Sequence, residues 1–534
     1  MNKQEIIKKY FPNVDSFRGV QEEAIDSLLE GEKVLCLMPT GGGKTLIFQV
    51  TGLALEKTTL VISPLVALME QQSSIMNLNG ISALNFSGMD GAKQFRTITK
   101  LGNDDMPKFI FISPERLSND GYLEYVLSKR RDDIGLVVID EVHCVSQWGE
   151  GFRPLYRNIP PMLDRVFGTQ WPRLLCLTAT LNAFQQKEVE HDFQITKTII
   201  DDNLWRENLN LEIINIKDGK DDTKDSELER IIEKHLGSKI LVFAHRKYGN
   251  KGTTRTLYEK YKDVYEGVAY FDSGMADSEK KKVLEGFSTG EIKIVFATSA
   301  FGMGVDIGDI RVVVNYLISE TVEQYYQEVG RGGRDGEPAF GYLLYTNQSR
   351  RGRMMLLNNS LCTEKELINE WEDRKLKEGK TYGHLSYESM EESQRIAFSL
   401  LQDYHVLSIV AKGVQSIKCF TGVTQRGKEF LKNLEQYSRA GYVTIICKKT
   451  GKNINSLTLE IWNYCLNGDI KLKSSLSKTI FYVVENELDD ELVKKIIDDQ
   501  ENKKRARIDN FTSFVDMIEQ GLSAEQIVRK TLDI

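Results

Sequence analysis

A glycine-rich segment near the N-terminus constrains the fold more than any other feature of this sequence. Residues 38–45 read MPTGGGKT, with the apolar run 34–37 before them and the helical pattern 46–50 after them. A strand, a glycine-rich turn and a helix N-terminus in this order cradle phosphate oxygens, because glycines let backbone N–H groups close around the anion. Met38 stands where the general phosphate-loop pattern has glycine, so a plain glycine-rich turn is the alternative interpretation.

The same segment supplies the side chains that a nucleoside triphosphate and its metal ion require. The Lys44 ammonium can reach the β and γ phosphates, and the Thr45 hydroxyl can join the shell of a magnesium ion. The sequence therefore predicts ATP and Mg²⁺ as cofactors. The residues predicted to hold them are Thr40, Gly41, Gly42, Gly43, Lys44 and Thr45.

Short apolar runs alternate with helix-length segments through about two thirds of the chain. Uninterrupted apolar runs of this length are typical of parallel strands covered on both faces. The first series comprises 34–37, 60–62, 109–112, 137–139 and 174–177, and the second comprises 240–243, 268–270, 294–296, 312–314 and 341–344. The pattern predicts two α/β units of similar size, separated by a charged loop at 217–222.

Two adjacent acids follow the fourth strand of the first series. Asp140 is suited to hold magnesium at the end of such a strand, and Glu141 is the candidate to polarise an attacking water. His143, two residues further on, is the candidate for a coupling role, with ordinary packing as the alternative. A solvated strand end is the alternative for the acid pair, but the phosphate loop upstream favours the metal-binding interpretation.

The second α/β unit supplies two arginines to complete such a site. The segment 327–336 reads QEVGRGGRDG and contains Gln327, Arg331 and Arg334. Arginines that reach a γ-phosphate across an interdomain cleft can raise the rate about 10³–10⁵-fold. Anion binding unrelated to hydrolysis is the alternative.

Composition limits the classes of protein that this chain can represent. The net charge of −7 and pI of about 5.7 argue against a polybasic nucleic-acid coat, so any such binding must use local grooves. Seven scattered cysteines without a CxxC pair make a structural zinc site unexpected and suit a reducing compartment. No segment resembles a signal peptide or a membrane span, so we expect a cytoplasmic protein with no membrane association.

The chain is long enough for three or four domains. The patterns predict α/β domains at 1–207 and 208–346, a helical linker at 347–385, a winged-helix module at 386–436 and a helical region at 437–534. Residues 391–410 predict a helix pair. The strand 416–420 and the segment 424–431 that follow suggest a small winged helix, with a helical accessory bundle as the alternative. Ser523 and Gln526 predict a capped last helix after a stop at Gly521.

The order of GGGKT, DEVH, TAT (178–180) and QEVGRGGR resembles the superfamily-two helicases over roughly residues 10–345. The segment 17–21, FRGVQ, narrows the resemblance to the RecQ family of DNA helicases. That resemblance implies two tandem RecA-like domains and a mostly helical C-terminal region. It also assigns family roles by position: adenine contacts to Arg18 and Gln21, strand-backbone contacts to Ser63, Pro64, Ser113 and Arg116, and coupling of DNA to ATP to Thr298 and Met303.

The segment 146–154, SQWGEGFRP, resembles the aromatic-rich loop with which this family senses single-stranded DNA. An aromatic ring offers any base a stacking face, and an arginine adds a phosphate or cation–π partner. The residues concerned are Gln147, Trp148, Phe152 and Arg153. Core packing of the two rings is the alternative, and the glycines and proline around them favour a loop.

The chain departs from the family pattern at three places. Val14 stands where an aromatic usually stacks on adenine, and Asp272 stands where a histidine is usual. The four-cysteine zinc module is absent, although 503–507 opens a segment reminiscent of its helical hairpin.

Three functions remain open from the sequence. The first is translocation on single-stranded DNA and unwinding of tailed duplexes, with 3′→5′ polarity implied by the resemblance. The second is an RNA helicase or a translocase that strips proteins. The third is a DNA-stimulated ATPase subunit of a repair or defence complex, with a protein partner on its C-terminal region. Candidate groove contacts are Arg246 with Lys247, the 350–353 arginines, Lys448 with Lys449 and Lys452, and 503–507.

Overall fold

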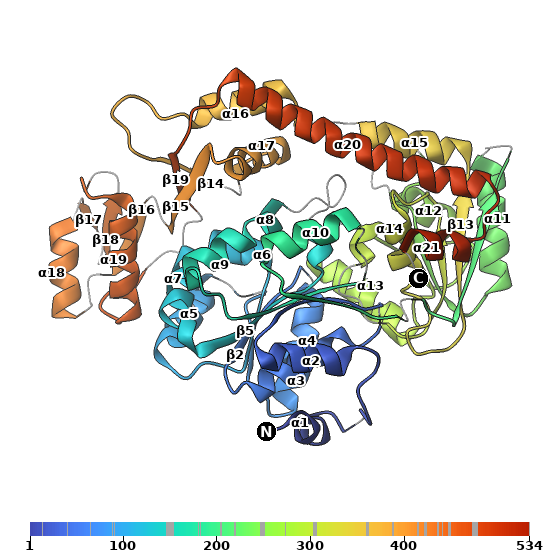
Figure 1. Cartoon of the computed structure of the whole chain (residues 1–534), viewed down its shortest axis with the longest axis horizontal. Coiled ribbons are helices and arrows are strands. Elements are labelled where there is room, and N and C mark those ends of the chain that lie inside the picture. The colour runs from blue at the N-terminus through green and yellow to red at the C-terminus, as the bar shows by residue number, and fades with distance from the viewer. Residues whose placement is uncertain are drawn as a thin grey trace.

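Two parallel sheets and a C-terminal region of helices and small sheets make up the chain (Figure 1). The computed structural model describes residues 1–532 apart from 13, 40, 65, 88, 90, 146–153, 180, 182, 203–204, 218–220, 246–250, 273, 303–306, 359–361, 387–388, 414–415, 421–423, 435–436, 440–441, 447–449 and 473–478.

The first domain contains a seven-stranded parallel sheet. Its spatial order is β3 (Ala83–Asn85), β4 (Phe109–Ile112), β2 (Thr58–Ile62), β5 (Ile134–Ile139), β6 (Arg173–Thr178), β1 (Lys33–Leu37) and β7 (Lys197–Ile200). The helices of this domain are α1 (Lys3–Tyr10), α2 (Gln21–Glu30), α3 (Lys44–Ala54), α4 (Val66–Leu78), α5 (Gly91–Asn103), α6 (Pro114–Asn119), α7 (Gly121–Lys129), α8 (Pro154–Arg157), α9 (Ile159–Phe167) and α10 (Ala183–Asp192), with short 3-10 turns at Arg131–Asp133 and Val142–Val145. Apolar clusters cover both faces of the sheet, as continuous apolar strands require.

The second domain repeats this design with six parallel strands. Their order is β10 (Val268–Phe271), β11 (Ile294–Ala297), β9 (Lys239–Phe243), β12 (Ile310–Asn315), β13 (Ala339–Tyr345) and β8 (Leu209–Asn215). The helices are α11 (Asp221–Lys234), α12 (Thr254–Tyr261), α13 (Asp277–Thr289), α14 (Val322–Val329) and α15 (Asn347–Asn358), with a 3-10 turn at Ser299–Gly302. The predicted fold class, two RecA-like parallel-sheet domains before a largely helical region, is confirmed.

The C-terminal region contains two small antiparallel sheets among its helices. One sheet has the order β14 (Gly383–Ser386), β19 (Thr479–Val484) and β15 (Leu407–Gly413), and the other has the order β16 (Ser416–Phe420), β18 (Tyr442–Ile446) and β17 (Tyr437–Arg439). The helices are α16 (Glu364–Arg374), α17 (Glu392–Asp403), α18 (Gln425–Leu434), α19 (Ile454–Leu466), α20 (Asp490–Glu519) and α21 (Ala524–Leu532).

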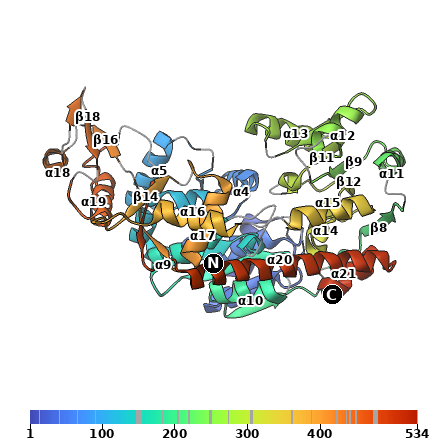
Figure 2. The ribbon, with the colours of Figure 1, turned by 90° about the horizontal axis from the view of Figure 1, so that it is seen from above.

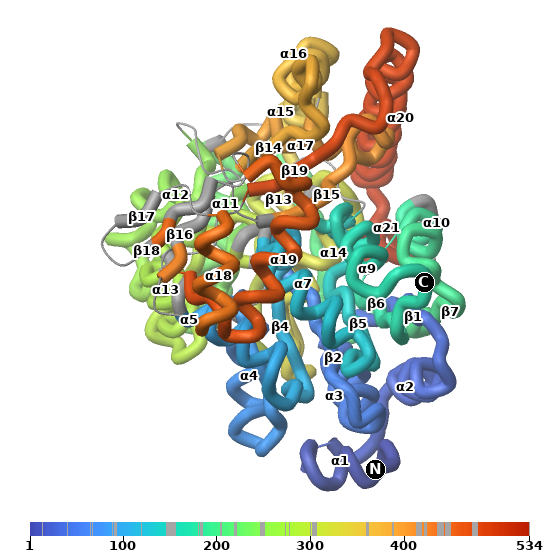
Figure 3. Tube along the Cα trace, turned by 90° about the vertical axis from the view of Figure 1, so that its left-hand side faces the viewer, coloured from blue at the N-terminus to red at the C-terminus, as the bar shows by residue number. Residues whose placement is uncertain are grey.

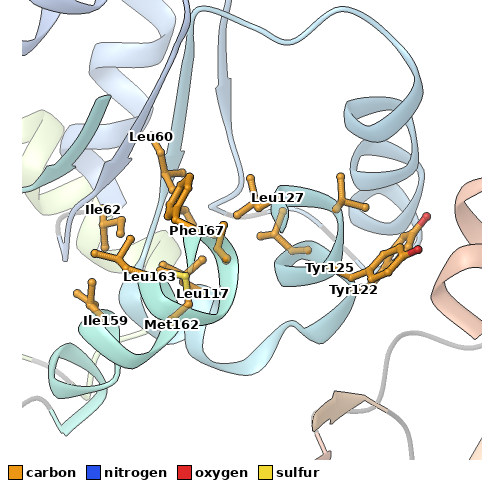
Figure 4. Close-up of a cluster of buried hydrophobic side chains, with 14 of the residues drawn as sticks. Leu60, Ile62, Leu117, Tyr122, Tyr125, Leu127, Ile159, Met162, Leu163 and Phe167 are labelled. Atoms are coloured by element: carbon orange, nitrogen blue, oxygen red, sulfur yellow. The ribbon is translucent and has the colours of Figure 1, made fainter. Parts of the chain in front are cut away.

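An apolar interface joins α19 to the first domain. Figure 3 shows α18 and α19 on the side of the molecule where α5 and α7 lie. The Trp462 ring lies 5.2 Å from the Tyr122 ring, and the Tyr125 hydroxyl donates to Asn463 over 3.3 Å. Tyr122 and Tyr125 stand at the edge of the buried cluster in Figure 4. This part of the C-terminal region therefore shares a hydrophobic core with the first domain.

The helix α20 reaches from the C-terminal region to the second domain (Figures 1 and 2). Near its start, Ile496 is buried among α16, α17 and β19. Near its end, Phe511, Phe514 and Ile518 are buried in the core of the second domain, where the Phe514 ring lies 6.2 Å from that of Tyr325. At 30 residues the helix spans about 45 Å. The C-terminal region is thus attached to both domains.

The sequence-based expectations for this region had mixed outcomes. The second half of the helix pair at 391–410 is wrong, because β15 begins at Leu407 and pairs with β19. The strand at 416–420 and the capped last helix are confirmed, and Ser523 exchanges hydrogen bonds with Gln526. The segment 424–431 lies largely in α18. The strands of the predicted winged-helix module belong to two different sheets, and its boundaries stay a prediction, like those of the other domains.

The charged loop predicted at 217–222 is shorter than expected at its C-terminal end, because α11 begins at Asp221, while 218–220 lie outside the described residues. Within the described part of the chain, no helix is long and apolar enough to cross a membrane.

We expect Phe514→Ala to destabilise the second domain, because the ring is fully buried in its core. A Phe→Ala change in a core typically costs about 3–5 kcal/mol. Leu78→Ala is the matched control, since that side chain is 86% exposed and surface changes usually stay within about 0.5 kcal/mol. Urea unfolding of the full chain measures both. Equal midpoints would show that α20 does not stabilise this domain.

Candidate active site

The phosphate loop connects the end of β1 to the start of α3, as the sequence predicts. Gly41 and Gly43 adopt left-handed backbone angles, with φ of 81° and 78°. A Cβ atom at Gly43 would lie 2.5 Å from the Gln21 amide nitrogen, so a larger residue does not fit there. Thr40 lies outside the described residues. The loop thus brings backbone N–H groups to a helix N-terminus, where an anion is favoured.

The two reactive side chains of the loop contact neighbouring groups. The Lys44 ammonium donates to the Met38 carbonyl over 3.4 Å. The Thr45 hydroxyl accepts a 3.2 Å hydrogen bond from the Gln72 amide of α4. Gln72 was not predicted as a residue of the ATP site.

The Gln21 side chain forms hydrogen bonds with the phosphate loop. Its amide nitrogen donates to the carbonyls of Gly42 and Gly43 over 3.0 and 3.1 Å, and its amide oxygen accepts from the Arg18 N–H over 2.9 Å. The pair predicted to read adenine therefore lies beside the loop, and the adenine contact itself stays a prediction.

Asp140 and Glu141 lie together just after β5, at the carboxyl end of the sheet. The Asp140 carboxylate accepts from the Ser63 hydroxyl over 3.0 Å and from the Glu141 N–H over 3.1 Å. Burial raises the pKa of Asp140, and the Glu141 carboxylate adds to the rise, while Lys44 opposes it. Burial also raises the pKa of Glu141, but Lys44 and His143 outweigh it and hold that pKa below its usual range. Glu141 is therefore the more strongly ionised acid.

His143 connects the acids to the next strand of the sheet. Its Nδ1 atom lies 3.3 Å from a Glu141 carboxylate oxygen and 3.1 Å from the Thr178 hydroxyl at the end of β6. Burial lowers the pKa of His143, but the Cys144 sulfur and Glu141 outweigh it and raise this pKa. These contacts place His143 between the DEVH and TAT segments, and its coupling role stays a prediction.

The two arginines of the second domain face this loop. A Cβ atom at Gly41 would lie 3.7 Å from Cγ of Arg334, so that arginine packs against the phosphate loop. Burial and the neighbouring Arg334 charge together lower the pKa of Arg331 to about 9, although Glu141 of the first domain opposes the fall. Gln327 lies half-buried on α14, which precedes the arginine turn. Predicted residues of the second domain therefore lie close to the predicted residues of the first.

The turn that carries the arginines is held by the segment between the domains. The Arg206 guanidinium donates to the carbonyl of Gly330 over 2.8 Å and to that of Gly333. The Asn208 amide donates to the same Gly333 carbonyl over 2.8 Å. Sequence analysis missed both residues, because nothing in their local pattern marks them and their partners lie more than a hundred residues away.

The oxygen atoms beside the loop fit a magnesium ion. Magnesium prefers hard oxygen ligands and is usually held by one or two carboxylates with phosphates and water. The Asp140 carboxylate and Thr45 hydroxyl provide such oxygens, and the cost of burying the Asp140 charge favours a neighbouring cation.

The structure describes only some of the residues predicted to contact nucleic acid. Ser63 and Pro64 are buried, and the Ser63 hydroxyl serves Asp140. Ser113 caps α6 by accepting from the Arg116 N–H over 3.3 Å, and the Thr298 N–H donates to Phe271 over 3.1 Å. Gln147, Trp148, Phe152, Arg153 and Met303 lie outside the described residues.

The predicted basic clusters are mostly engaged within the protein. Arg353 is 1% exposed and donates to the Ile318 carbonyl, so its prediction as a surface contact is wrong. Arg350 pairs with Glu519 over 3.0 Å. Arg507 and Lys452 pair with acids as well, while Arg246, Lys247, Lys448 and Lys449 lie outside the described residues.

The two residues that depart from the family pattern contact other parts of their own domains. Val14 packs against the apolar cluster over α2 and α3. Asp272 is fully buried and pairs with the Arg255 guanidinium over 3.1 Å.

Comparison with known proteins agrees with this geometry. The DEAD/DEAH box helicase family matches residues 18–189, and the helicase conserved C-terminal domain matches 223–336. One match falls in each parallel-sheet domain and covers most of it, so fold and site define a two-domain helicase motor. Within this class, the chain belongs to the RecQ family of ATP-dependent helicases.

Two relatives carry that assignment. The ATP-dependent DNA helicase RecQ of Bacillus subtilis is 32% identical over 68% of this chain and 59% of its own length. The ATP-dependent DNA helicase hus2/rqh1 of Schizosaccharomyces pombe is 34% identical over 62% of this chain and 25% of its own length. The match thus spans less than two thirds of either relative. The structure of the helicase MrfA bound to DNA shares the fold, with a TM-score of 0.53 at 18% identity over 76% of this chain and 57% of that one.

We expect Arg206→Lys to reduce ATP turnover, because an ammonium cannot reproduce the fork that holds two carbonyls of the arginine turn. A misplacement of about 1 Å in a reacting group can cost on the order of 100-fold, so we expect a loss of about 10–100-fold with little change in KM for ATP. Steady-state ATP hydrolysis measures it. Arg230→Lys, on the outer surface of the second domain, is the control. An unchanged kcat in Arg206→Lys would contradict the anchoring role.

Proposed function

We propose that this chain is an ATP-dependent DNA helicase that moves along single-stranded DNA and separates duplexes. The observation that carries the proposal is the meeting of Arg331 and Arg334 with the phosphate loop and acids of the other domain. Three buried or half-buried cations gather there around two acids. Such a surplus of positive charge suits a polyphosphate, which would relieve the repulsion between the arginines.

The residues of the cleft suit the steps of phosphoryl transfer. The phosphate loop and Lys44 bind the β and γ phosphates, and Glu141, kept ionised by Lys44 and His143, orients and deprotonates the attacking water. Arg331 and Arg334 stabilise the charge that develops on the γ-phosphate, with Gln327 beside them. Magnesium, held by Asp140 and Thr45, would neutralise phosphate charge when bound. Gln21 and Arg18 are the proposed contacts to adenine.

Hydrolysis can drive movement because the site is divided between two domains. Loss of the γ-phosphate removes the anion that holds the arginines against the loop, so the cleft can open in each cycle. The proposed single-strand contacts are Pro64, Ser113, Arg116, Thr298 and Met303, with Gln147, Trp148, Phe152 and Arg153 of the aromatic-rich loop. His143 is proposed to link these single-strand contacts to Asp140 and Glu141. The direction of movement proposed from the family resemblance is 3′→5′.

A partner-dependent ATPase is the alternative that the C-terminal region favours. That region is attached to both domains and differs from the family's zinc module. On this alternative, the isolated chain would hydrolyse ATP in response to DNA but unwind poorly without a stable protein partner.

We expect single-stranded DNA to stimulate ATP hydrolysis strongly, and Lys44→Ala to lower that rate at least about 100-fold, because it removes a cation from the transferring phosphate. Steady-state rates without nucleic acid and with single-stranded DNA, duplex DNA and single-stranded RNA measure this. Trp148→Ala should leave the basal rate intact and lose the stimulation.

Stimulation by RNA alone, or by no nucleic acid, would contradict the DNA helicase assignment. Where single-stranded DNA stimulates, unwinding of duplexes with 3′ or 5′ tails then tests polarity. DNA-stimulated hydrolysis without unwinding of either substrate would favour the partner-dependent alternative.

A further inference from the structure

A short helix, α8, lies between the ATP site and the C-terminal region. It directly follows the segment 146–153 and precedes α9. Its residue Tyr156 is fully buried. The tyrosine hydroxyl donates a 3.1 Å hydrogen bond to the backbone carbonyl of Asp140. The main chain of the proposed magnesium ligand is therefore held from α8.

The next residue of α8 faces the other way, toward the C-terminal region. The Arg157 guanidinium donates to Asp403, the last residue of α17, over 2.7 Å and to Glu188 of α10 over 3.2 Å. Only 14% of the Arg157 side chain is exposed, so solvent screens these pairs less than it would at the surface. Two adjacent residues of one helical turn thus connect the ATP site with α17.

The helix α20 passes the same junction. Burial lowers the pKa of Lys503, the Arg157 charge lowers it further, and Glu188 and Asp403 oppose both. About one helical turn before Lys503, the Asp499 carboxylate accepts a hydrogen bond from the Tyr404 hydroxyl over 2.5 Å. The charges around Arg157 therefore come from three elements: α10, α17 and α20.

The far part of α20 contacts the segment that leads into the arginine helix. Arg507 donates to Glu320 over 2.8 Å, two residues before α14 begins at Val322. The Phe514 ring then packs near Tyr325 of α14. A single continuous helix thus touches both the α8 junction of the first domain and the helix before Arg331 and Arg334.

We propose that α8 is a coupling element, with Tyr156 and Arg157 as positioning residues. When the cleft closes or opens, α20 moves with the second domain, shifts the charges against Arg157 and changes the hold of Tyr156 on Asp140. The C-terminal region thereby sets how far nucleic acid stimulates ATP turnover. This inference rests on the proposed function, because it concerns the control of that ATPase.

The polar nature of the junction supports movement there. The contacts of α19 with the first domain, such as Trp462 on Tyr122, are apolar and closely packed, and packed cores resist small displacements. Ion pairs and hydrogen bonds at Arg157 can exchange partners among several acids with little change in volume. The contacts beside α8 are therefore the ones that can rearrange when the C-terminal region and the first domain move relative to each other.

We expect Tyr156→Phe to lower the DNA-stimulated kcat about tenfold, since a small displacement of Asp140 affects the reacting geometry more than ground-state binding of ATP. KM for ATP and the melting temperature should change little, and the Mg²⁺ concentration for half-maximal rate should rise. Tyr125→Phe is the matched control. Like Tyr156→Phe, it deletes one hydroxyl hydrogen bond. The bond lost in this case joins Tyr125 of the first domain to Asn463 of α19 and does not involve the acids.

Two results separate this inference from the function on which it rests. Stimulation by single-stranded DNA in the unsubstituted chain, with the same stimulation in Tyr156→Phe, would overturn the coupling and leave the proposed function intact. No stimulation in the unsubstituted chain would overturn both. A fall in melting temperature shared by Tyr156→Phe and Tyr125→Phe, with equal kcat, would show a structural role only and overturn the coupling.

A double-mutant cycle tests the link from α8 to α17. Arg157→Gln and Asp403→Asn should each reduce the ratio of DNA-stimulated to basal ATPase about fivefold, and the double variant should be no worse than either single one. Lys375→Gln, which removes an exposed ion pair with Glu372 within the C-terminal region, is the charge control and should leave the ratio unchanged. Independent, additive effects of the two substitutions, or none, would overturn the link.

Discussion

Two arginines from one domain are held close to each other and to a half-buried pair of acids in the other domain. Like charges at short range repel, and burial strengthens the repulsion, which lowers the pKa of Arg331. Glu141 offsets part of this cost from across the cleft, as Lys44 does for the acids. The charge of Arg331 is therefore favoured by the approach of Glu141 from the first domain. The negative charge of a bound nucleotide would offset the remaining repulsion between the two arginines and so favour the approach of the two domains.

This constraint explains how the acids are fixed. Each group is held by a residue from a different strand end: Ser63 after β2 holds the Asp140 carboxylate, and Thr178 at the end of β6 contacts His143, which in turn holds Glu141. Parallel strands place all their carboxyl ends at one edge of a sheet, which is where such folds build their ligand sites. The geometry of the site therefore follows from the order β2-β5-β6 in the sheet.

Sequence patterns predicted the strands and motifs well where the information is local. The central strands were found because both of their faces are covered, and the phosphate loop, acids and arginine turn follow fixed spacings. The edge strands β3, β7 and β8 were missed because their apolar pattern is broken by exposed or half-buried positions. The helix expected up to residue 410 was wrong because Leu407 and Ile409 pair with β19, some seventy residues later. Arg206, Gln72 and Tyr156 were missed for the same reason: their partners are set by the tertiary fold.

The C-terminal region follows from the same division of the site between domains. A region attached to both domains either fixes the distance between them or contains contacts that can rearrange when the domains move. Here the two ends of the attachment are apolar: Trp462 packs on the first domain and Phe514 in the second. The stretch between them, along the middle of α20, is charged and meets its neighbours through ion pairs such as Arg507 with Glu320. Apolar cores at the ends fix the position of the region, and polar pairs between them permit small shifts. A region built in this way can transmit the state of one domain to the other without leaving either.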